Sequence, residues 1–211
     1  MASTETIVDE LRADILSAVF LPGERLVELD LTERYGCGRA VVRAALVHLE
    51  SEGLVDRQVN RGAVVHRISV DEAIEITEAR AALEGFIAGR AAAKADESDV
   101  GRLQALVEEM RMAVAQDDAA SYSDVNRRLH AVIREIAGHG IAGQLVQNLR
   151  NRGVQGQFHL SRLPGRQAAS LTQHEAIVNA IAAGDEEAAV QAMTTHLTSV
   201  VDVLRRWEDG R

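Results

Sequence analysis

The stretch LVELDLTERYGCGRAVVRAALVHLESEGLVDRQVNRGAVV, residues 26–65, contains two helical patterns, a short glycine-containing segment between them, and two strand patterns after them. Gly36 suits the left-handed turn that ends a helix. Before it, apolar residues recur near helical spacing, which predicts the first helix. These residues are Leu26, Leu29, Leu31 and Tyr35.

A second helix is predicted from about Arg39 to about Ser51. Its apolar residues are spaced three and four apart and would form the buried face. They are Val42, Ala45, Leu46 and Leu49. Residues 54–59 then predict a strand, residues 60–62 a turn and residues 63–65 the returning strand. Helix, turn, helix and a two-stranded wing together predict a winged helix-turn-helix, a unit that reads double-stranded DNA.

Arginines on this unit are the candidate DNA contacts. Arg39 and Arg43 lie four apart, so they share the face opposite the buried one, at the end of the helix that enters the major groove. Arginine can contact guanine or pair with a phosphate. Arg34 before the turn and Arg61 with Gly62 at the wing tip complete the predicted set. Any one of these arginines, taken alone, is better interpreted as a solvated surface charge. The whole set, on a predicted winged helix-turn-helix, favours contact with DNA.

The charge distribution agrees with this surface although the whole chain carries a net charge of -9. Residues 34–67 hold six arginines and three acidic residues, a balance of +3, whereas residues 70–211 hold 15 basic and 21 acidic residues, a balance of -6. Few phosphates would be neutralised, so we expect modest non-specific affinity. A two-fold dimer on a palindromic site would double those contacts.

The composition is that of a soluble globular protein. Of 211 residues, 46% are hydrophobic and 26% charged, and no apolar run approaches the length of a membrane span. The N-terminus shows no signal-peptide pattern. The single cysteine, Cys37, cannot form an internal disulfide, which fits a reducing compartment. We therefore expect a cytoplasmic protein without a membrane partner, in which Cys37 is a small structural residue of the turn.

Two domains are predicted, residues 1–69 and residues 70–211. The second shows only helical patterns, interrupted at Asp96, at residues 138–140, at residues 164–165 and at residues 184–185. The expected fold class is mainly α, with an antiparallel bundle of six helices after the winged domain. The expected helices are 71–95, 98–116, 119–137, 141–161, 167–183 and 186–207.

The order of motifs resembles the GntR superfamily of bacterial transcription regulators, in its FadR-type branch with the all-helical FCD domain. The resemblance rests on ILSAVFLPGERL, GCGRAVVRAALVHLESEGLV and NRGAVV in the first domain, and on EARAALEGFIAGRAA, NRRLH and HEAIVNAIAAGDEEAAVQAMTTHL in the second. It implies a homodimer that represses from a palindromic operator and releases it when a small effector enters the helical domain. Gly38 and Ala40 stand where the family usually has hydroxyl residues, so operator preference is expected to differ.

The resemblance also implies a divalent metal held by an acidic residue and three histidines. The matching positions are Asn126, His130, His174 and His196. Imidazole ligands suit zinc, nickel, copper or iron, and we expect zinc or nickel. Asn126 replaces the usual aspartate; a neutral amide is a poorer ligand and leaves more positive charge for an incoming carboxylate. The alternative is three unrelated histidines, each satisfied by a hydrogen bond.

Two arginines are candidates for binding a carboxylate effector. Arg80 lies at a position whose arginine often faces the effector cavity in members of the family. The planar guanidinium group suits a carboxylate. An internal ion pair between Arg80 and Glu84, one turn later, is an equally weighted alternative. Arg134 shares a helix face with His130 and is the second candidate.

Two other functions compete with a metabolite-responsive regulator. In one, the second domain only dimerises and any metal is structural. In the other, the histidines activate water in a metalloenzyme. The second is disfavoured because no general base stands beside the histidines: Glu175 adjoins His174 but points elsewhere on a helix. Phosphate-loop, nucleophile-elbow and dinucleotide motifs are also missing from the sequence.

Overall fold

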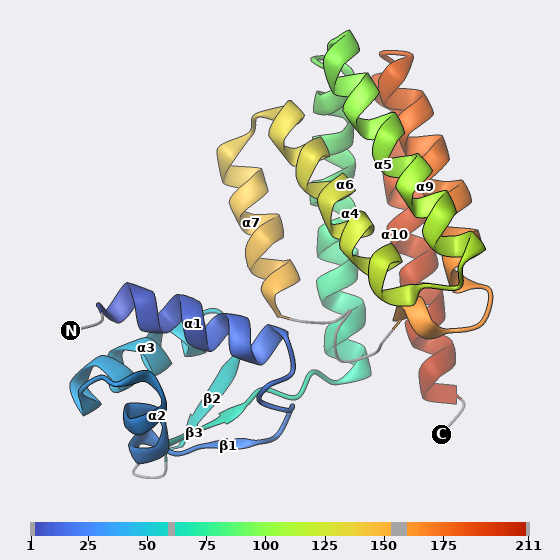
Figure 1. The fold of residues 1–211 in the computed structure, drawn as a ribbon. Helices are drawn as coiled ribbons and strands as arrows, with labels where there is room; N and C mark the ends of the chain where they lie inside the picture. Colours follow the sequence, from blue (N-terminus) through green and yellow to red (C-terminus); the bar gives the residue numbers. More distant parts are fainter. Residues whose placement is uncertain (1–2, 59–61, 153–159, 210–211) are drawn as a thin grey trace. The chain divides into compact units, whose positions relative to one another are not determined.

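The computed structural model describes residues 3–58, 62–152 and 160–209 (Figure 1). The chain divides into two compact units between Ser69 and Val70, and the segment that starts at Arg150 groups with the first unit. None of the helices in the described ranges is both long and apolar enough to cross a membrane.

The first unit is a helical domain with a small sheet. Three antiparallel strands lie in the order β1-β3-β2, with Arg25 opposite Val64 and Val55 opposite Val65. The predicted helix, turn, helix and wing are thus confirmed, and the sheet gains one short strand. The elements are α1 (Thr4–Leu16), β1 (Arg25–Leu26), α2 (Glu28–Tyr35), α3 (Arg39–Ser51), β2 (Val55–Gln58) and β3 (Gly62–Val65).

Helix α3 has the bounds and the buried face that its sequence predicts. The four predicted core residues on it are each at most 1% exposed. Gly36 ends α2 in the left-handed conformation, with φ 58°, and Gly38 is the N-cap of α3. Ile7, Val8 and Leu11 of α1 complete the same core. Burial of these apolar faces holds α3 in place.

Two predictions about the first helix of the helix-turn-helix are wrong. Leu26 lies in β1 rather than in a helix, and Leu29 is 48% exposed, so only Leu31 is a buried residue of α2. The helix is short because its N-terminal neighbour pairs with β3 in the sheet. Helix α1 was not predicted, although its apolar residues recur at helical spacing. The predicted wing-tip turn at residues 60–61 lies outside the described residues.

The second unit contains six α-helices and one 3-10 helix within the described ranges, which confirms a mainly α bundle. Helix α4 packs along α10, α9 packs on α10 and α5, and α6 packs on α4 and α5 (Figure 1). The elements are α4 (Val70–Ala92), α5 (Glu97–Ala115), α6 (Ala119–Ala137), α7 (Gly140–Asn151), η1 (Leu160–Arg162), α9 (Arg166–Ala182) and α10 (Glu186–Asp209).

The fourth helix of this bundle is shorter than predicted. Helix α7 ends at Asn151, not at residue 161, and Arg152 forms a turn. The sequence signal that marks this end is Gly153, since glycine is common just past a helix terminus.

Two glycines one turn apart let α4 approach α10 closely. A Cβ on Gly85 would lie 2.8 Å from Oγ1 of Thr194, and a Cβ on Gly89 would lie 2.8 Å from Cγ2 of Val190. Larger residues at these positions would push the two helices apart. Because α4 carries Glu84 and α10 carries His196, this contact sets how polar groups on the two helices can meet.

A core substitution in α3 tests whether the buried face supports the first unit. Leu46→Ala is expected to lower the free energy of unfolding by about 2–5 kcal/mol, because it leaves a cavity in a fully packed core. Val47→Ala, one residue later at a side chain 46% exposed, is the matched control, with a change within about 0.5 kcal/mol. Denaturant unfolding followed by circular dichroism measures both. Equal stability of the two variants would contradict the assigned core.

Candidate DNA-binding surface and metal centre

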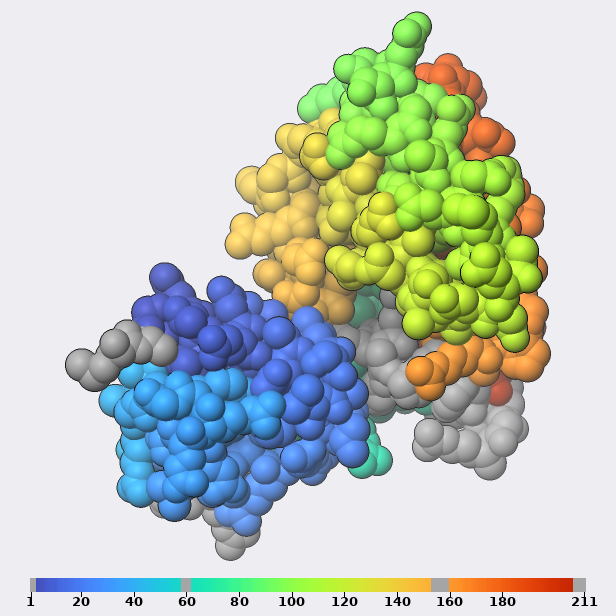
Figure 2. All heavy atoms as spheres, in the orientation of Figure 1, coloured from blue at the N-terminus to red at the C-terminus, as the bar shows by residue number. Residues whose placement is uncertain are grey.

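Arg39 and Arg43 lie on the exposed face of α3, opposite its buried stripe. Both side chains are exposed, and the part of the first unit that contains α3 faces solvent in Figure 2. Arg39 is the first residue of the helix, and Arg43 is one turn later. The two guanidinium groups are therefore presented together at the N-terminal end of α3, as the sequence pattern requires.

Arg43 is held by a carboxylate from the preceding helix. Its Nε donates to both oxygens of Glu28 on α2, at 3.0 and 2.8 Å, while 64% of its side chain stays exposed. An ion pair this exposed contributes little to stability. The ion pair instead orients the guanidinium of Arg43, because its Nε bonds to Glu28 and its two terminal nitrogens remain able to contact a ligand.

Arg34 occupies a different environment from the two arginines of α3. Its Nη2 lies 2.9 Å from Oδ2 of Asp14, and its guanidinium carbon lies 5.1 Å from the centre of the Phe20 ring. The hydroxyl of Tyr35 donates to the same Asp14 oxygen at 2.8 Å. Arg34 thus links α1 to α2, and about half of its side chain remains exposed.

The wing residue Gly62 has a packing reason to be glycine. Its φ is +82°, and a Cβ would lie only 2.5 Å from the carbonyl oxygen of Leu26. The close approach of β3 to β1 therefore excludes a side chain there. Arg61, the other predicted wing contact, lies outside the described residues.

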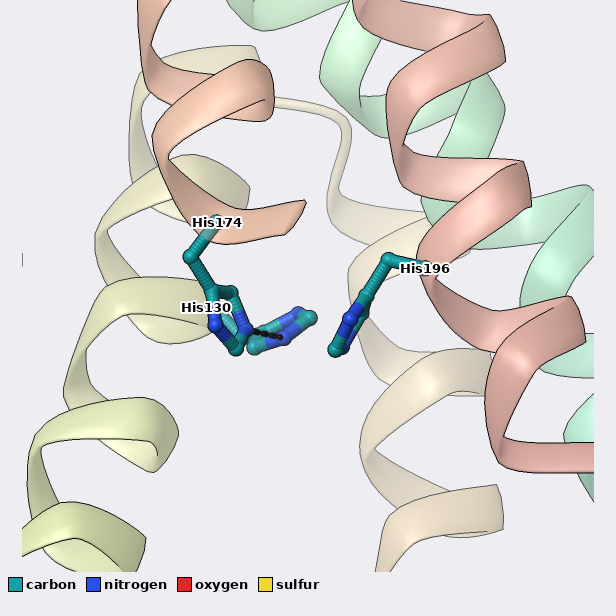
Figure 3. Close-up of side chains that lie close together, drawn as sticks. All are labelled: His130, His174 and His196. Atoms are coloured by element: carbon teal, nitrogen blue, oxygen red, sulfur yellow. Dashed lines mark hydrogen bonds between the residues drawn. The ribbon is translucent and has the colours of Figure 1, made fainter. Parts of the chain in front are cut away.

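Three histidines from three helices of the second unit converge in its interior. His130 of α6, His174 of α9 and His196 of α10 are 1%, 0% and 3% exposed, and their ligand nitrogens all lie within 4.8 Å of one another. The Nε2 atoms of His130 and His174 are 3.4 Å apart. Figure 3 shows the three rings turned toward one another. We call these residues the histidine triad.

Each ring of the triad is held from its Nδ1 side. His130 Nδ1 donates to Oε2 of Glu84 at 2.6 Å. His196 Nδ1 donates to the amide oxygen of Gln173 at 3.0 Å, and His174 Nδ1 lies 3.3 Å from the hydroxyl of Tyr122. These bonds place Nε2 of each ring inside the triad, where the Nε2 atoms of His130 and His174 bond to each other. Partners of this kind fix the tautomer and orientation of metal-binding histidines.

Burial also affects the protonation of two rings of the triad. Removal from water lowers the pKa of His174 and of His196 well below 6.5, and the charges of neighbouring histidines and of Arg166 lower both further. Neutral imidazole is the form that binds a metal. These two rings therefore have the required form at neutral pH.

Asn126 supplies an oxygen that the protein leaves unsatisfied. It lies one helical turn before His130 on α6 and is 8% exposed, and its Oδ1 has no hydrogen-bond partner among the described residues. A buried amide oxygen without a partner is costly. Three imidazole nitrogens with a nearby uncommitted oxygen form a donor set that fits a divalent metal, so the residues present are compatible with the expected ion.

The two predicted effector residues lie around one buried carboxylate. Nε of Arg80 donates to Oε1 of Glu84 at 2.8 Å, and Nη2 lies 2.7 Å from the same oxygen without a well-aligned hydrogen bond. The ion pair that was the alternative role for Arg80 is therefore present. Arg134 is half-buried; desolvation lowers the pKa of its guanidinium, the charge of Glu84 raises it, and Nη1 has no partner within the described part of the chain.

The remaining described histidines lie apart from the triad. His48 is exposed, His66 pairs with Asp56, and His139 accepts a hydrogen bond from the Ala142 amide at the start of α7. His159 lies outside the described residues. The three histidines that the resemblance selected are thus the three that meet.

The sequence motifs do not indicate the groups that bond to the Nδ1 atoms of the triad. Gln173 directly precedes His174, and Tyr122 lies one turn before Asn126, so both positions lie just outside the motifs that contain the ligands. The sequence indicates Glu84 only as a partner of Arg80, one helical turn earlier. Its bond to His130 joins residues 46 apart in sequence, which no local pattern indicates.

Comparisons with known proteins match both units. The family described as "Bacterial regulatory proteins, gntR family" matches residues 3–65, and the FCD domain family matches residues 75–199. HTH-type transcriptional repressor RspR of Escherichia coli K12 is 26% identical over 196 residues, which cover 93% of this chain and 86% of that protein.

A second relative and a solved structure agree. The Uxu operon regulator of Haemophilus influenzae is 29% identical over 208 residues, covering 90% of this chain and 77% of its own length. The structure of E. coli McbR/YncC superposes with a TM-score of 0.81 at 21% identity, over 99% of this chain and all of that one. The last likeness concerns the fold.

Replacing one histidine of the triad tests the metal centre. His174→Ala is expected to reduce bound zinc or nickel from about one ion per chain to below a tenth, since two imidazoles and one amide are a poor site. The solvent-exposed His48→Ala is the matched control and should retain its metal. Elemental analysis after metal loading and dialysis measures both. Full metal content in the His174 variant would contradict this ligand set.

Proposed function

We propose that this chain, which belongs to the gntR family of bacterial regulatory proteins and carries an FCD domain, is a homodimeric repressor that a small carboxylate releases from DNA. Its family makes it a DNA-binding transcription regulator rather than an enzyme. In this proposal the winged domain binds one half of a palindromic operator. The helical domain binds a divalent metal and the effector.

The exposed arginines of α3 support the DNA-binding part of the proposal. Arg39 has no ion pair with a described residue, and Arg43 is oriented by Glu28 with most of its side chain in solvent. Both can contact base edges or phosphates. Arg34 and the wing at residues 61–62 are proposed to contact the DNA backbone. Each winged domain would neutralise few phosphates, which is why we propose a dimer on a palindrome.

Removing the guanidinium of Arg43 tests this surface. Arg43→Ala is expected to weaken binding to a palindromic duplex, selected from a random pool with the wild-type protein, by about 1–3 kcal/mol. Fluorescence anisotropy at a fixed salt concentration measures the affinity. Arg102→Ala in α5 is the control, because Arg102 is also an exposed arginine in an ion pair but lies in the helical unit. Wild-type affinity in the Arg43 variant would exclude α3 as the reading helix.

Buried positive charge supports a carboxylate as the effector. Arg80 and Arg134 both lie near the single carboxylate of Glu84, and Nη1 of Arg134 makes no hydrogen bond with a described residue. Buried cations without full compensation favour an anionic ligand. The amide of Asn126 adds no negative charge to the donor set. A carboxylate entering here would satisfy donors that the protein leaves open.

The proposed metal is zinc or nickel, held by the three imidazoles and the oxygen of Asn126. When bound, it supplies a positive centre that attracts a carboxylate oxygen. Burial favours the neutral form of His174 and His196, and the chain fixes each ring of the triad through Glu84, Gln173 or Tyr122. Repression is proposed because release on effector binding is the expected response, and the relative RspR is named a repressor.

Effector release can be measured on the selected duplex. Acetate-to-hexanoate monocarboxylates and malonate-to-adipate dicarboxylates are titrated into the complex of zinc-loaded protein and DNA. At least one acid should raise the apparent Kd for DNA tenfold or more, because an effector acts through its different affinities for the two states. Arg134→Gln should require at least tenfold more acid for the same release.

The control for this experiment is Arg127→Gln, an exposed arginine on the same helix, which should respond as the wild type does. If no acid in the panel changed the DNA affinity of wild-type protein, effector release by a carboxylate would be excluded. The helical domain would then be assigned to dimerisation alone.

A further inference from the structure

Arg166 is a half-buried cation that has no acidic partner among the described residues. It is the first residue of α9, and its Nη1 donates to the hydroxyl of Ser199 on α10 at 3.0 Å. Desolvation lowers the pKa of its guanidinium, nearby Tyr122 raises it, and the charge of Arg206 lowers it again. Most other arginines of this unit pair with a carboxylate. Arg166 is therefore held in place without its charge being balanced.

A chain of hydrogen bonds connects Arg166 to the histidine triad. The hydroxyl of Ser199 lies 3.0 Å from Oε1 of Gln173, and that oxygen accepts the Nδ1–H of His196 at 3.0 Å. The guanidinium is also close enough for its charge to act on His174 and on the hydroxyl of Tyr122. Arg166 thus belongs to the surroundings of the triad, although sequence motifs did not single it out.

The triad is consequently accompanied by two separate groups of cations. Arg80 and Arg134 come from α4 and α6 and share the carboxylate of Glu84, which bonds to His130. Arg166 comes from α9 and is linked to His196. One carboxylate on an effector can pair with the cations of the first group. It leaves the charge of Arg166 unbalanced, and a second acidic group on the effector could pair with it.

We propose that Arg166 binds a second carboxylate of the effector, so that the effector is a dicarboxylate spanning the triad between the two groups of cations. This inference rests on the proposed function, since it assumes that a carboxylate enters the helical domain. It assigns a binding role to Arg166. A purely structural role would consist of joining α9 to α10 through Ser199.

Isothermal titration calorimetry on full-length, zinc-loaded protein tests this assignment. Malonate, succinate, glutarate and adipate are compared with monocarboxylates of the same carbon number. Wild-type protein should bind at least one dicarboxylate tenfold or more tightly than its monocarboxylate counterpart. Arg166→Gln should lose that preference while its monocarboxylate affinity stays within twofold and its zinc content stays unchanged.

Two further variants separate binding from structure. Arg162→Gln, an exposed arginine on η1, is the matched control and should retain the preference. Ser199→Ala removes the hydrogen bond but keeps the charge, so it should also retain most of the preference. If Arg166→Gln does not fold, as judged by circular dichroism, Arg166→Lys takes its place and should lower the preference by threefold or more.

The outcomes distinguish this inference from the proposed function. Monocarboxylate binding by wild-type protein without any preference for a dicarboxylate would overturn the role of Arg166 and leave the carboxylate effector intact. A preference that survives in the Arg166 variants, or that Ser199→Ala abolishes equally, would also overturn it. If no acid bound at all, both proposals would fall.

Discussion

The hydrogen bond between His130 and Glu84 is the interaction around which the helical unit is organised. Both side chains are at most 2% exposed, and the bond is 2.6 Å long. A carboxylate buried this deeply is costly unless cations and donors compensate it, and Arg80 and His130 do so together. The bond joins α4 to α6 and turns Nε2 of His130 toward the other two imidazoles. The close packing of α4 on α10, allowed by Gly85 and Gly89, then brings His196 within reach.

A different constraint governs the first unit, where the apolar face of α3 is buried against α1 and the sheet. A helix that buries one side must present the other, so Arg39 and Arg43 face solvent. Glu28 restrains Arg43 before any ligand arrives, which would lower the entropy cost of ordering this side chain in the proposed DNA contact. Burial therefore positions the exposed arginines of α3 in one unit, and buried polar bonds position the triad of the other.

Sequence patterns predicted the helices well where apolar spacing and glycine breaks agree, as for α3 and α6. They were less successful where tertiary pairing changed a local preference. Leu26 has a helical spacing to its neighbours, but its backbone pairs with Ala63 in the sheet. The end of α7 at Asn151 was missed because the apolar pattern continues past Gly153. The histidine positions came from motif order, and the family match places that motif in an FCD domain.

Spacing along the chain was enough to define helix faces, the turn at Gly36 and the two arginines one turn apart, because the 3.6-residue period is local. Packing alone decided which polar groups meet. Glu84 reaches His130 across 46 residues, and Arg166 reaches Ser199 across 33. Such contacts depend on helix crossings and on the close approach of α4 to α10. Those arise from the sum of many apolar contacts, and no short stretch of sequence contains them.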